Sequence, residues 1–291
     1  MPNPVPRVAA IHDLSGFGRA SLTVIIPVLS TMGVQVCPLP TAVLSTHTGG
    51  FDGYHFVDLT EEMTPIVEHW QAMDIPFDAI YSGFLGSPRQ VDLVTDFIAR
   101  FRSEGQLVVV DPVMGDNGEP YQTMGPEMIQ RMGDLVGRAD IITPNFTEAV
   151  FLLGESYREH VEQDELKDWI RRLCDLGPGR VVISSVPVAG HDDISSVVAY
   201  DRDDGRFWRV DCTYVPAYYP GTGDIFASVI VGSMLQGDSL PLALDRAVQF
   251  VSMAIRASFG YRNPSREGVL LERVLSNLRA PITASSYQIM A

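Results

Sequence analysis

Lysine is almost absent from this sequence, and acidic residues far outnumber basic ones. Of its 291 residues only Lys167 is a lysine, and 36 acidic against 21 basic side chains give a formal net charge of −15. This balance argues against a protein that binds nucleic acid or an anionic membrane through a broad basic face. It also excludes the phosphate loop G-x-x-x-x-G-K-[ST], which needs a lysine after its glycines. A protein of this composition that handles phosphate must use backbone amides, arginines and metal ions.

Cysteines are also few, and long apolar segments are missing. Cys37, Cys174 and Cys212 are far apart, odd in number and in no metal-binding spacing. They are expected to be reduced thiols of a cytoplasmic protein. The N-terminus lacks the pattern of a signal peptide, and no apolar run approaches the ~18 residues of a membrane helix. We therefore expect a cytoplasmic protein with no membrane or nucleic acid as a partner.

Short apolar runs typical of buried strands alternate with segments of helical pattern. Strands are predicted at 8–11, 34–36, 79–81, 107–110, 140–142 and 181–183, with a hairpin of 195–200 and 206–211. Helices are predicted at 21–32, 63–73, 88–102, 129–136, 146–153, 165–176, 224–235 and 240–258. Such βα units predict an α/β fold with a mainly parallel sheet covered on both faces. We expect one domain over residues 1–291, with a tail of about 15 residues at its end.

Polar and small residues follow six of the predicted strands. In open α/β sheets, ligands bind beyond the carboxyl ends of the strands, so these residues should converge on one site. They are His12 and Asp13, 45–50, 82–84, 111–112, 143–145 and 184–185.

The first glycine cluster, residues 16–21, reads G-F-G-R-A-S and resembles a dinucleotide-binding fingerprint. That fingerprint also needs an acidic residue about 20 positions later to bind ribose. No acidic residue occurs between Asp13 and Asp52. The cluster therefore favours a tight turn or a substrate loop over an NAD site.

The second glycine cluster, residues 219–224, reads Y-P-G-T-G-D and precedes an apolar helix. Its glycines permit a close backbone approach to a ligand, and the helix start offers free N–H groups to an anion. Asp224 would repel a resting phosphate, so its presence needs a reason. It is either a helix cap or a general base beside an anion hole.

Two further motifs place acids and an amide after buried strands. Residues 111–116 read D-P-V-M-G-D, and residues 143–148 read T-P-N-F-T-E. Asp111 and Asp116 could share a hydrated divalent cation, or Asp111 could cap the proline turn while Asp116 is solvated. Asn145 and Glu148 have the spacing of a capping box, which is compatible with side chains that face a site.

Together these motifs resemble the ribokinase superfamily, and within it the pyridoxal kinase group. The G-T-G-D motif before the last helices is similar to the anion-hole and base motif of the superfamily. D-P-V-M-G-D and I-T-P-N-x-x-E are similar to motifs of its vitamin kinases, and S-T-H-T-G at 45–49 is similar to S-N-H-T-G of pyridoxal kinases. The four motifs occur in the same order from about residue 8 to residue 258. The resemblance implies a ribokinase-like three-layer α/β/α sandwich and a homodimer.

The resemblance also implies a reaction and the residues that perform it. Asp224 would deprotonate the 5′-hydroxymethyl group of a B6 vitamer, while the amides of Gly221, Thr222 and Gly223 stabilise the transferred phosphoryl group of ATP. The implied cofactors are Mg²⁺ and a monovalent cation such as K⁺, with metal-site residues Asp111, Asp116, Thr143 and Glu148. The implied ATP-binding residues are Asp111, Tyr121 in a mobile flap, Asn145, Glu148, Ser184 and Thr222. The implied vitamer-binding residues are Asp13, Ser15, His47, Thr48 and Phe84.

One departure concerns the first strand end. Pyridoxal kinases often begin Q-S-H-V, whereas Asp13-x-Ser15-Gly16 is more similar to the G-S-D-x-S-G opening of hydroxymethylpyrimidine kinases. Asp13 is the residue expected to read the ring, with a preference for a protonated or amine-bearing vitamer such as pyridoxamine. The alternatives are a hydroxymethylpyrimidine kinase of thiamine synthesis and a non-catalytic protein that binds pyridoxal phosphate or a nucleotide.

Overall fold

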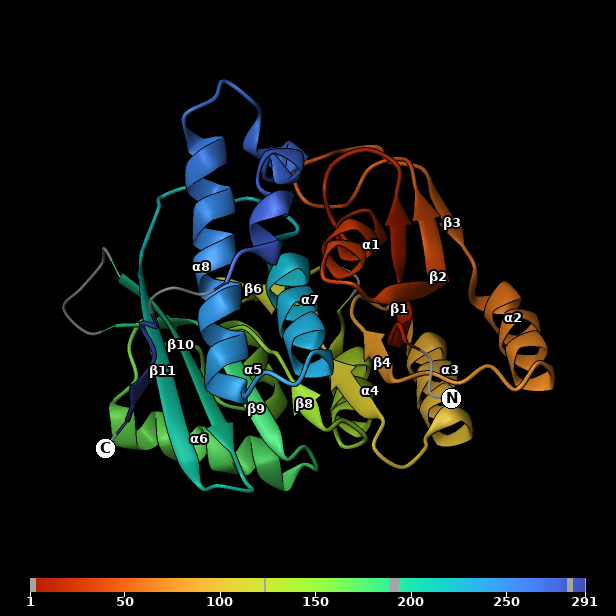
Figure 1. Ribbon diagram of the computed structural model, residues 1–291, viewed down its shortest axis with the longest axis horizontal. Helices are drawn as coiled ribbons and strands as arrows, with labels where there is room; N and C mark the ends of the chain where they lie inside the picture. Colours follow the sequence, from red (N-terminus) through yellow and green to blue (C-terminus); the bar gives the residue numbers. More distant parts are fainter. Residues whose placement is uncertain (1–3, 123, 189–193, 282–284, 291) are drawn as a thin grey trace.

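Strands and helices alternate along the residues described by this computed structural model, 4–122, 124–188, 194–281 and 285–290 (Figure 1). The strands are β1 (Arg7–Ser15), β2 (Gln35–Leu44), β3 (Phe56–Asp58), β4 (Ala79–Ser82), β5 (Leu107–Val110), β6 (Gly115–Asp116), β7 (Glu119–Pro120), β8 (Ile141–Ile142), β9 (Arg180–Pro187), β10 (Ile194–Asp201), β11 (Arg206–Thr213) and β12 (Gln288–Ile289). The helices are α1 (Leu22–Thr31), α2 (Thr60–Ala72), α3 (Pro88–Phe101), α4 (Pro126–Val136), α5 (Phe146–Leu153), α6 (Gln163–Asp175), α7 (Thr222–Leu235) and α8 (Leu240–Phe259). Short 3₁₀ helices at Ser265–Glu267, Leu271–Arg273 and Leu275–Arg279 follow α8.

The strands form one ten-stranded sheet in the order β12-β11-β10-β9-β8-β5-β4-β1-β2-β3. Neighbours from β9 through β2 run parallel. The pairs β9–β10, β10–β11, β11–β12 and β2–β3 are antiparallel, so the sheet is mainly parallel with antiparallel margins. A separate two-stranded ribbon, β6–β7, follows β5. The predicted hairpin is confirmed as β10 and β11.

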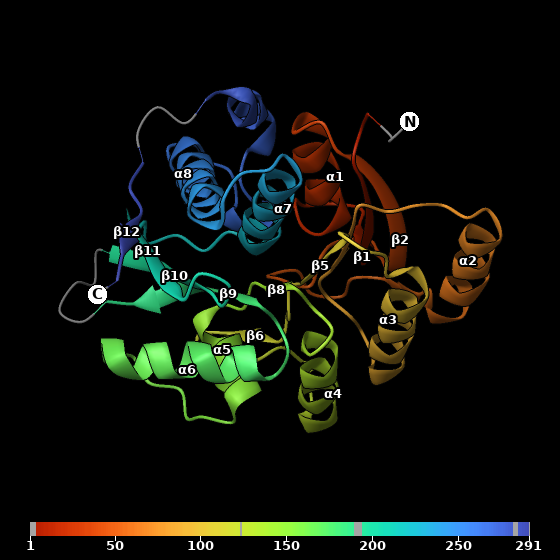
Figure 2. The ribbon, with the colours of Figure 1, turned by 60° about the horizontal axis from the view of Figure 1, so that its bottom comes forward.

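Helices cover both faces of the sheet. Helices α1, α7 and α8 lie on one face, and α2 to α6 lie on the other (Figure 2). Alternate residues of β1 serve the two sides: Val8 and Ala10 pack toward the first group, and Ala9 and Ile11 toward the second. The expected three-layer α/β/α sandwich with a mainly parallel sheet is confirmed.

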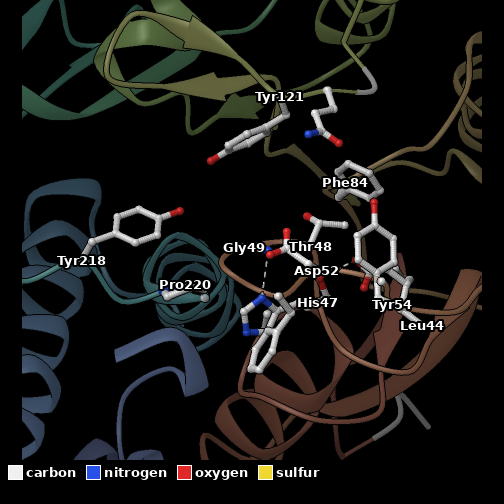
Figure 3. Close-up of a pocket in the computed structure, with 17 residues that line it drawn as sticks. Leu44, His47, Thr48, Gly49, Asp52, Tyr54, Phe84, Tyr121, Tyr218 and Pro220 are labelled. Carbon is white, nitrogen blue, oxygen red and sulfur yellow. Dashed lines mark hydrogen bonds between the residues drawn. The ribbon is translucent and has the colours of Figure 1, made fainter. Parts of the chain in front are cut away.

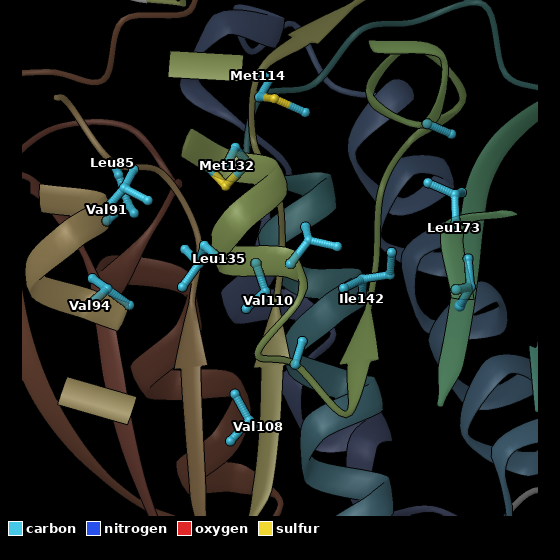
Figure 4. Close-up of a cluster of buried hydrophobic side chains, with 14 of the residues drawn as sticks. Leu85, Val91, Val94, Val108, Val110, Met114, Met132, Leu135, Ile142 and Leu173 are labelled. Carbon is cyan, nitrogen blue, oxygen red and sulfur yellow. The ribbon is translucent and has the colours of Figure 1, made fainter. Parts of the chain in front are cut away.

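The layer between the sheet and helices α3 and α4 fixes the strand ends that carry polar residues. Burial of each large aliphatic side chain contributes about 1.5–3 kcal/mol to the free energy of folding. With β4, β5 and β8 anchored this way, the residues that follow them have fixed starting points. The side chains packed here are Leu85, Val91, Val94, Val108, Val110, Met114, Met132, Leu135 and Ile142 (Figure 4).

Strand β1 is longer than the sequence pattern predicts. It continues to Ser15, so His12 and Asp13 lie inside the strand and not after it. Polar side chains hid this continuation, because an apolar run is the signal for a buried strand. The pairing of β1 with β2 is irregular between His12 and Leu14, which brackets Asp13. Such irregularities redirect side chains beside binding sites.

Strand β2 is also longer than predicted, because prolines obscure it. Pro38 and Pro40 pair with Ala10 and His12 of β1. A proline offers no N–H to a second neighbour, and so argues against a central strand. The structure accommodates both, because β3 pairs only with residues Ala42 to Leu44 of β2.

Helices α2 and α4 each begin three residues before their predicted starts, because their first turns are polar.

The chain end contributes to the sheet where the structure describes it. We expected a tail of about 15 residues, but Gln288–Ile289 pairs with Trp208 and Arg209 of β11. Such a two-residue strand has no detectable periodicity in the sequence.

Cys37, Cys174 and Cys212 are free, as expected. Among the described residues, no helix has both the length and the apolar composition needed to cross a bilayer.

Candidate active site

Two cavities lie at the carboxyl edge of the sheet and share a wall. The first, about 390 Å³, is lined by β1 and by the loops that follow β2 and β4. The second, about 320 Å³, is lined by the loops after β5 and β8 and by β9, β10, β11, α7 and α8. Tyr121, Tyr218, Pro220 and Gly221 line both. All six predicted strand ends supply lining residues, so they converge as expected.

Helix α7 begins at the shared wall. Gly221, its N-cap, has φ of 82°, and a Cβ at this position would lie 2.0 Å from the carbonyl oxygen of Arg19. Only glycine combines this backbone conformation with this close approach. Gly221 lines both cavities, and Thr222 and Gly223 line the second, so the free N–H groups and the positive end of the helix dipole lie at the second cavity beside the shared wall. The Thr222 hydroxyl donates to the Tyr219 carbonyl at 3.0 Å, so it braces this turn.

Asp224 is not the cap of α7, which resolves the choice that the sequence left open. Gly221 is the N-cap, and no side chain caps the helix start. Instead one Asp224 oxygen accepts the backbone N–H of Ser21 at 2.8 Å. Burial, together with the charges of Asp111 and Asp13, raises the pKa of Asp224 to about 7. A carboxyl group with such a pKa can accept and return a proton near neutral pH.

Ser21 joins Asp224 to a second buried carboxylate. Its hydroxyl donates to Asp13 at 2.5 Å, and Ser15 donates to the other Asp13 oxygen at 2.9 Å. Ser21 has φ of 52°, an uncommon conformation for a residue with a side chain. Ser15 is fully buried and does not line the first cavity, so its observed role is to hold Asp13.

The acids after β5 and β8 divide into lining and supporting groups. Asp111 lines the second cavity and accepts the Thr143 hydroxyl at 2.9 Å. Glu148 lies behind it and accepts the N–H groups of Met114 at 3.0 Å and Asn145 at 2.8 Å. Asn145 accepts the Glu148 N–H at 2.9 Å, which confirms the predicted capping box. Burial raises the pKa of both Asp111 and Glu148.

The donor set of the second cavity fits a hydrated Mg²⁺. Asp111 and Asp116 both line this cavity and offer hard carboxylate oxygens. Mg²⁺ commonly takes one or two carboxylates and completes its shell with water and phosphate. No group of three or more His, Cys, Asp or Glu residues in the described ranges is arranged to hold a metal. Thr143 and Glu148, expected as metal-site residues, do not line the cavity and instead brace Asp111 and its loop.

His47 lines the first cavity, but its two nitrogens are already used. Nε2 lies 2.7 Å from the carbonyl oxygen of Arg266 and must carry the proton, while Nδ1 accepts the Gly49 N–H at 3.1 Å (Figure 3). Burial lowers the pKa of His47, so its ring is neutral. It therefore offers a ring edge and a fixed loop to a ligand. Thr48 and Phe84 line the same cavity, as expected.

Part of the lining of the second cavity is apolar and is called the apolar slot below. It consists of Val197 of β10 and Val248 and Val251 of α8, and Ser184 and Ser195 line the same cavity. Apolar side chains with a few polar groups suit a flat ring with polar edge atoms. Asn145 and Ser184 both line this cavity, as expected for a nucleotide site.

Several lining residues had no signal in the sequence. Tyr218 faces Tyr121 across the shared wall, and burial raises the pKa of both phenols (Figure 3). Asp52 and Tyr54 line the first cavity from the loop after β2. The unusual Ser21 backbone depends on packing between α1 and α7, which no local pattern encodes. Aromatic residues just before the second glycine cluster were the one available hint for Tyr218.

The raised pKa of Asp224 predicts how stability depends on pH. From about pH 4, the ordinary value, to about 7, the folded protein holds a proton that the unfolded chain has lost. The Asp224 contribution to the free energy of unfolding is therefore complete below this window. It falls as pH rises through the window, by up to about 1.4 kcal/mol per pH unit.

Asp224→Asn removes this titration and keeps an oxygen for the Ser21 amide. Urea unfolding without nucleotide or metal should show that the free energy of unfolding of the variant rises relative to that of the parent protein between pH 5 and 7. The surface variant Asp92→Asn should show the same pH dependence of the free energy of unfolding as the parent protein. The same pH dependence in Asp224→Asn as well would contradict the raised pKa of Asp224.

Comparisons with known proteins agree with this architecture. A family model described as phosphomethylpyrimidine kinase matches residues 25–266. The structure of a putative phosphomethylpyrimidine kinase from Bacteroides thetaiotaomicron, solved with pyridoxal, is 55% identical; the match covers 98% of this chain and 100% of that one, with a TM-score of 0.96. Pyridoxal kinase from Lactobacillus plantarum is 32% identical, with 94% and 96% of the chains covered and a TM-score of 0.86.

A curated relative gives the same picture from sequence. Pyridoxal kinase of Arabidopsis thaliana is 28% identical over 272 residues, which are 88% of this chain and 83% of the relative. The family match spans most of this chain, and the similarity to the two structures extends over nearly all of it. The chain therefore belongs to the phosphomethylpyrimidine kinase family, alongside the pyridoxal kinases of the ribokinase superfamily.

Proposed function

We propose that the protein transfers the γ-phosphoryl group of ATP to the 5′-hydroxymethyl group of B6 vitamers. The observation that carries this proposal is the α7 N-terminus between the two cavities: Gly221 lines both, and Asp224, which lines the second, accepts the N–H of Ser21, which lines the first. The vitamer occupies the first cavity, and ATP occupies the second with its ring in the apolar slot. Phosphoryl transfer needs mainly alignment and charge neutralisation, which two adjoining sites at a helix N-terminus supply.

Each residue at the junction has a separate task. Asp224 takes the proton of the vitamer hydroxyl. The hydroxyl oxygen forms a bond to the γ-phosphorus of ATP while the bond between that phosphorus and the leaving oxygen of ADP breaks. The amides of Gly221, Thr222 and Gly223 donate to the equatorial oxygens of the transferred group. Tyr121 and Tyr218 shield this point from water between the two cavities.

Asp111 and Asp116 would hold Mg²⁺ against the ATP phosphates, and the ion would offset their negative charge. Because lysine is absent from this site, such a cation and the helix dipole replace the lysine of other phosphate loops. We also propose that a monovalent cation such as K⁺ binds near Ser184, which lines the second cavity.

The main rival is phosphorylation of hydroxymethylpyrimidine, because the matching family model and the 55%-identical structure carry the related name phosphomethylpyrimidine kinase. Similarity to a pyridoxal-containing structure at 55% identity favours the B6 vitamers. A non-catalytic role in binding pyridoxal phosphate or a nucleotide is disfavoured by a base with a raised pKa at the junction.

A substrate panel tests the proposal directly. ADP release with Mg²⁺, K⁺ and ATP should be measured for pyridoxal, pyridoxine, pyridoxamine and hydroxymethylpyrimidine. We expect turnover of the B6 vitamers at higher kcat/KM than of hydroxymethylpyrimidine. Turnover of hydroxymethylpyrimidine alone would establish the rival reaction, and no turnover of any would favour a binding role.

Asp224→Asn tests the assignment of the base. Loss of a general base typically lowers kcat by about 10² to 10⁴. The KM for ATP should change less than about threefold, because the second cavity keeps its shape. Asp92→Asn, the same change on the surface, should leave kcat intact. An unimpaired kcat in Asp224→Asn would remove this residue from the chemical step.

We further propose that the protein is a cytoplasmic homodimer. Its three cysteines are all free, which suits a reducing compartment. The edge strand β3 leaves Phe56 39% and Val57 42% exposed, an apolar surface that a second copy could cover. Light scattering should give twice the 32.0 kDa chain mass. A mass of one chain at micromolar concentration would contradict the dimer.

A further inference from the structure

The segment that follows α8 packs against two loops that line the first cavity (Figure 1). Residues 265–273, called the C-terminal strap below, contain the first two 3₁₀ helices after α8. Val269 and Leu271 of the strap are buried in the core, and the Leu270 N–H donates to the Ser258 hydroxyl of α8 at 2.7 Å. The strap is therefore a fixed part of the fold, and the two loops rest on it.

The first of these loops precedes α1. The Arg19 backbone N–H donates to the Glu267 carbonyl at 3.1 Å, and the Arg19 guanidinium forms a salt bridge with Glu272 at 3.0 Å. A Cβ at Gly268 would lie 2.8 Å from the Arg19 carbonyl oxygen, so the two backbones meet where no side chain fits. These contacts fix the strap relative to the wall that Ser21 forms in the first cavity.

The second loop follows β2 and carries His47 and Phe51, which both line the first cavity. The protonated Nε2 of His47 donates to the Arg266 carbonyl at 2.7 Å. The Arg266 guanidinium lies over the Phe51 ring, 4.9 Å from its centre. Phe51 in turn packs edge to face with His47, and their ring centres are 5.0 Å apart. Arg266 therefore contacts two neighbouring cavity-lining rings, one through its backbone and one through its side chain.

Arg266 makes these contacts from outside the site. It lines neither of the two cavities, and it is exposed. The backbone of the loop is also close to it, because a Cβ at Gly50 would lie 3.2 Å from the Arg266 Cβ. A cation over an aromatic ring at an exposed site changes an equilibrium constant by about two- to fivefold. The guanidinium thus stabilises the position of Phe51 by a measurable amount.

We propose that Arg266 is a positioning residue for vitamer binding and that it acts through Phe51. This inference rests on the proposed function, in which the vitamer occupies the first cavity. With the guanidinium in place, the Phe51 ring is already held where the vitamer meets it. Without the guanidinium, binding has to order this ring and its loop, which weakens affinity. The effect belongs to the KM for the vitamer, because ATP and the base Asp224 lie at the second cavity, which Arg266 does not line.

Two substitutions of Arg266 test the role of its charge. Arg266→Met keeps a long unbranched side chain without the cation, and Arg266→Lys keeps the cation. With ADP release as the assay, Arg266→Met should raise the KM for pyridoxal about two- to fivefold, with kcat and the KM for ATP changed less than about 1.5-fold. Arg266→Lys should recover at least about half of the change in KM, because an ammonium also binds an aromatic face.

Arg273→Met is the matched control from the same strap. The Arg273 guanidinium lies over the Tyr261 ring, 4.8 Å from its centre, and neither residue lines either cavity. The variant loses the same charge and the same kind of contact. It should therefore change the KM for pyridoxal less than about 1.5-fold.

A double-mutant cycle identifies the ring through which Arg266 acts. Phe51→Leu keeps an apolar side chain and removes the aromatic face. Because the contact is then already lost, adding Arg266→Met to Phe51→Leu should raise the KM for pyridoxal less than about 1.5-fold further.

Three results would overturn the proposal. They are an unchanged KM for pyridoxal in Arg266→Met, an equal increase in Arg273→Met, and a full effect of Arg266→Met in the Phe51→Leu protein. Thermal unfolding shows whether each variant is folded, and Arg266→Gln replaces Arg266→Met if that variant is not. Failure of the proposed function would appear instead in the unmodified protein, as the absence of phosphorylation of any vitamer.

Discussion

The arrangement of this site depends on one serine that contacts two carboxylates. The backbone N–H of Ser21 donates to Asp224, and its hydroxyl donates to Asp13. The contact with Asp224 joins the residue before α1 to the first turn of α7, and these two residues lie 203 positions apart in the sequence. Together the two contacts set the proposed base relative to the Asp13 carboxylate, at 2.8 Å and 2.5 Å. The left-handed backbone of Ser21 is strain that this pair of contacts supports.

A second constraint is the concentration of buried acids without nearby lysine. Asp111, Glu148 and Asp224 lie close enough to influence one another, and burial raises the pKa of each. Glu148 is satisfied by two backbone amides, whereas Asp111 and Asp224 face the cavities. In the proposed function, bound cations and the α7 dipole would offset part of this negative charge. The near absence of lysine is thus consistent with phosphate chemistry.

Much of the fold was predictable because local signals and tertiary structure agree. Strand β5 is an uninterrupted apolar run, and its ends and direction follow from that pattern. The full length of strand β2 was not predictable, because Pro38 and Pro40 suppress the local strand signal. The structure tolerates both prolines because β3 pairs only with the end of β2, so the second side of β2 is unpaired at these residues. Within the site, Asp224 and Gly221 were found from their motif. Asp111 faces the second cavity, whereas Glu148 binds the backbone of the loop after β5. This difference could be assigned only from the contacts in the structure. Tyr218 and the conformation of Ser21 likewise depend on packing between distant segments.

Gly221 has a consequence for how the starts of α1 and α7 are joined. Its α-carbon sits so close to the Arg19 carbonyl that a methyl group would not fit between them. The loop before α1 and the start of α7 therefore lie in direct contact, and the hydrogen bond from Ser21 to Asp224 joins them. Other segments supply the remaining lining residues of the first cavity, among them Asp52, Tyr54 and Tyr121 (Figure 3). Any side chain at position 221 would push these two segments apart, so a substitution there would disturb the starts of both helices together.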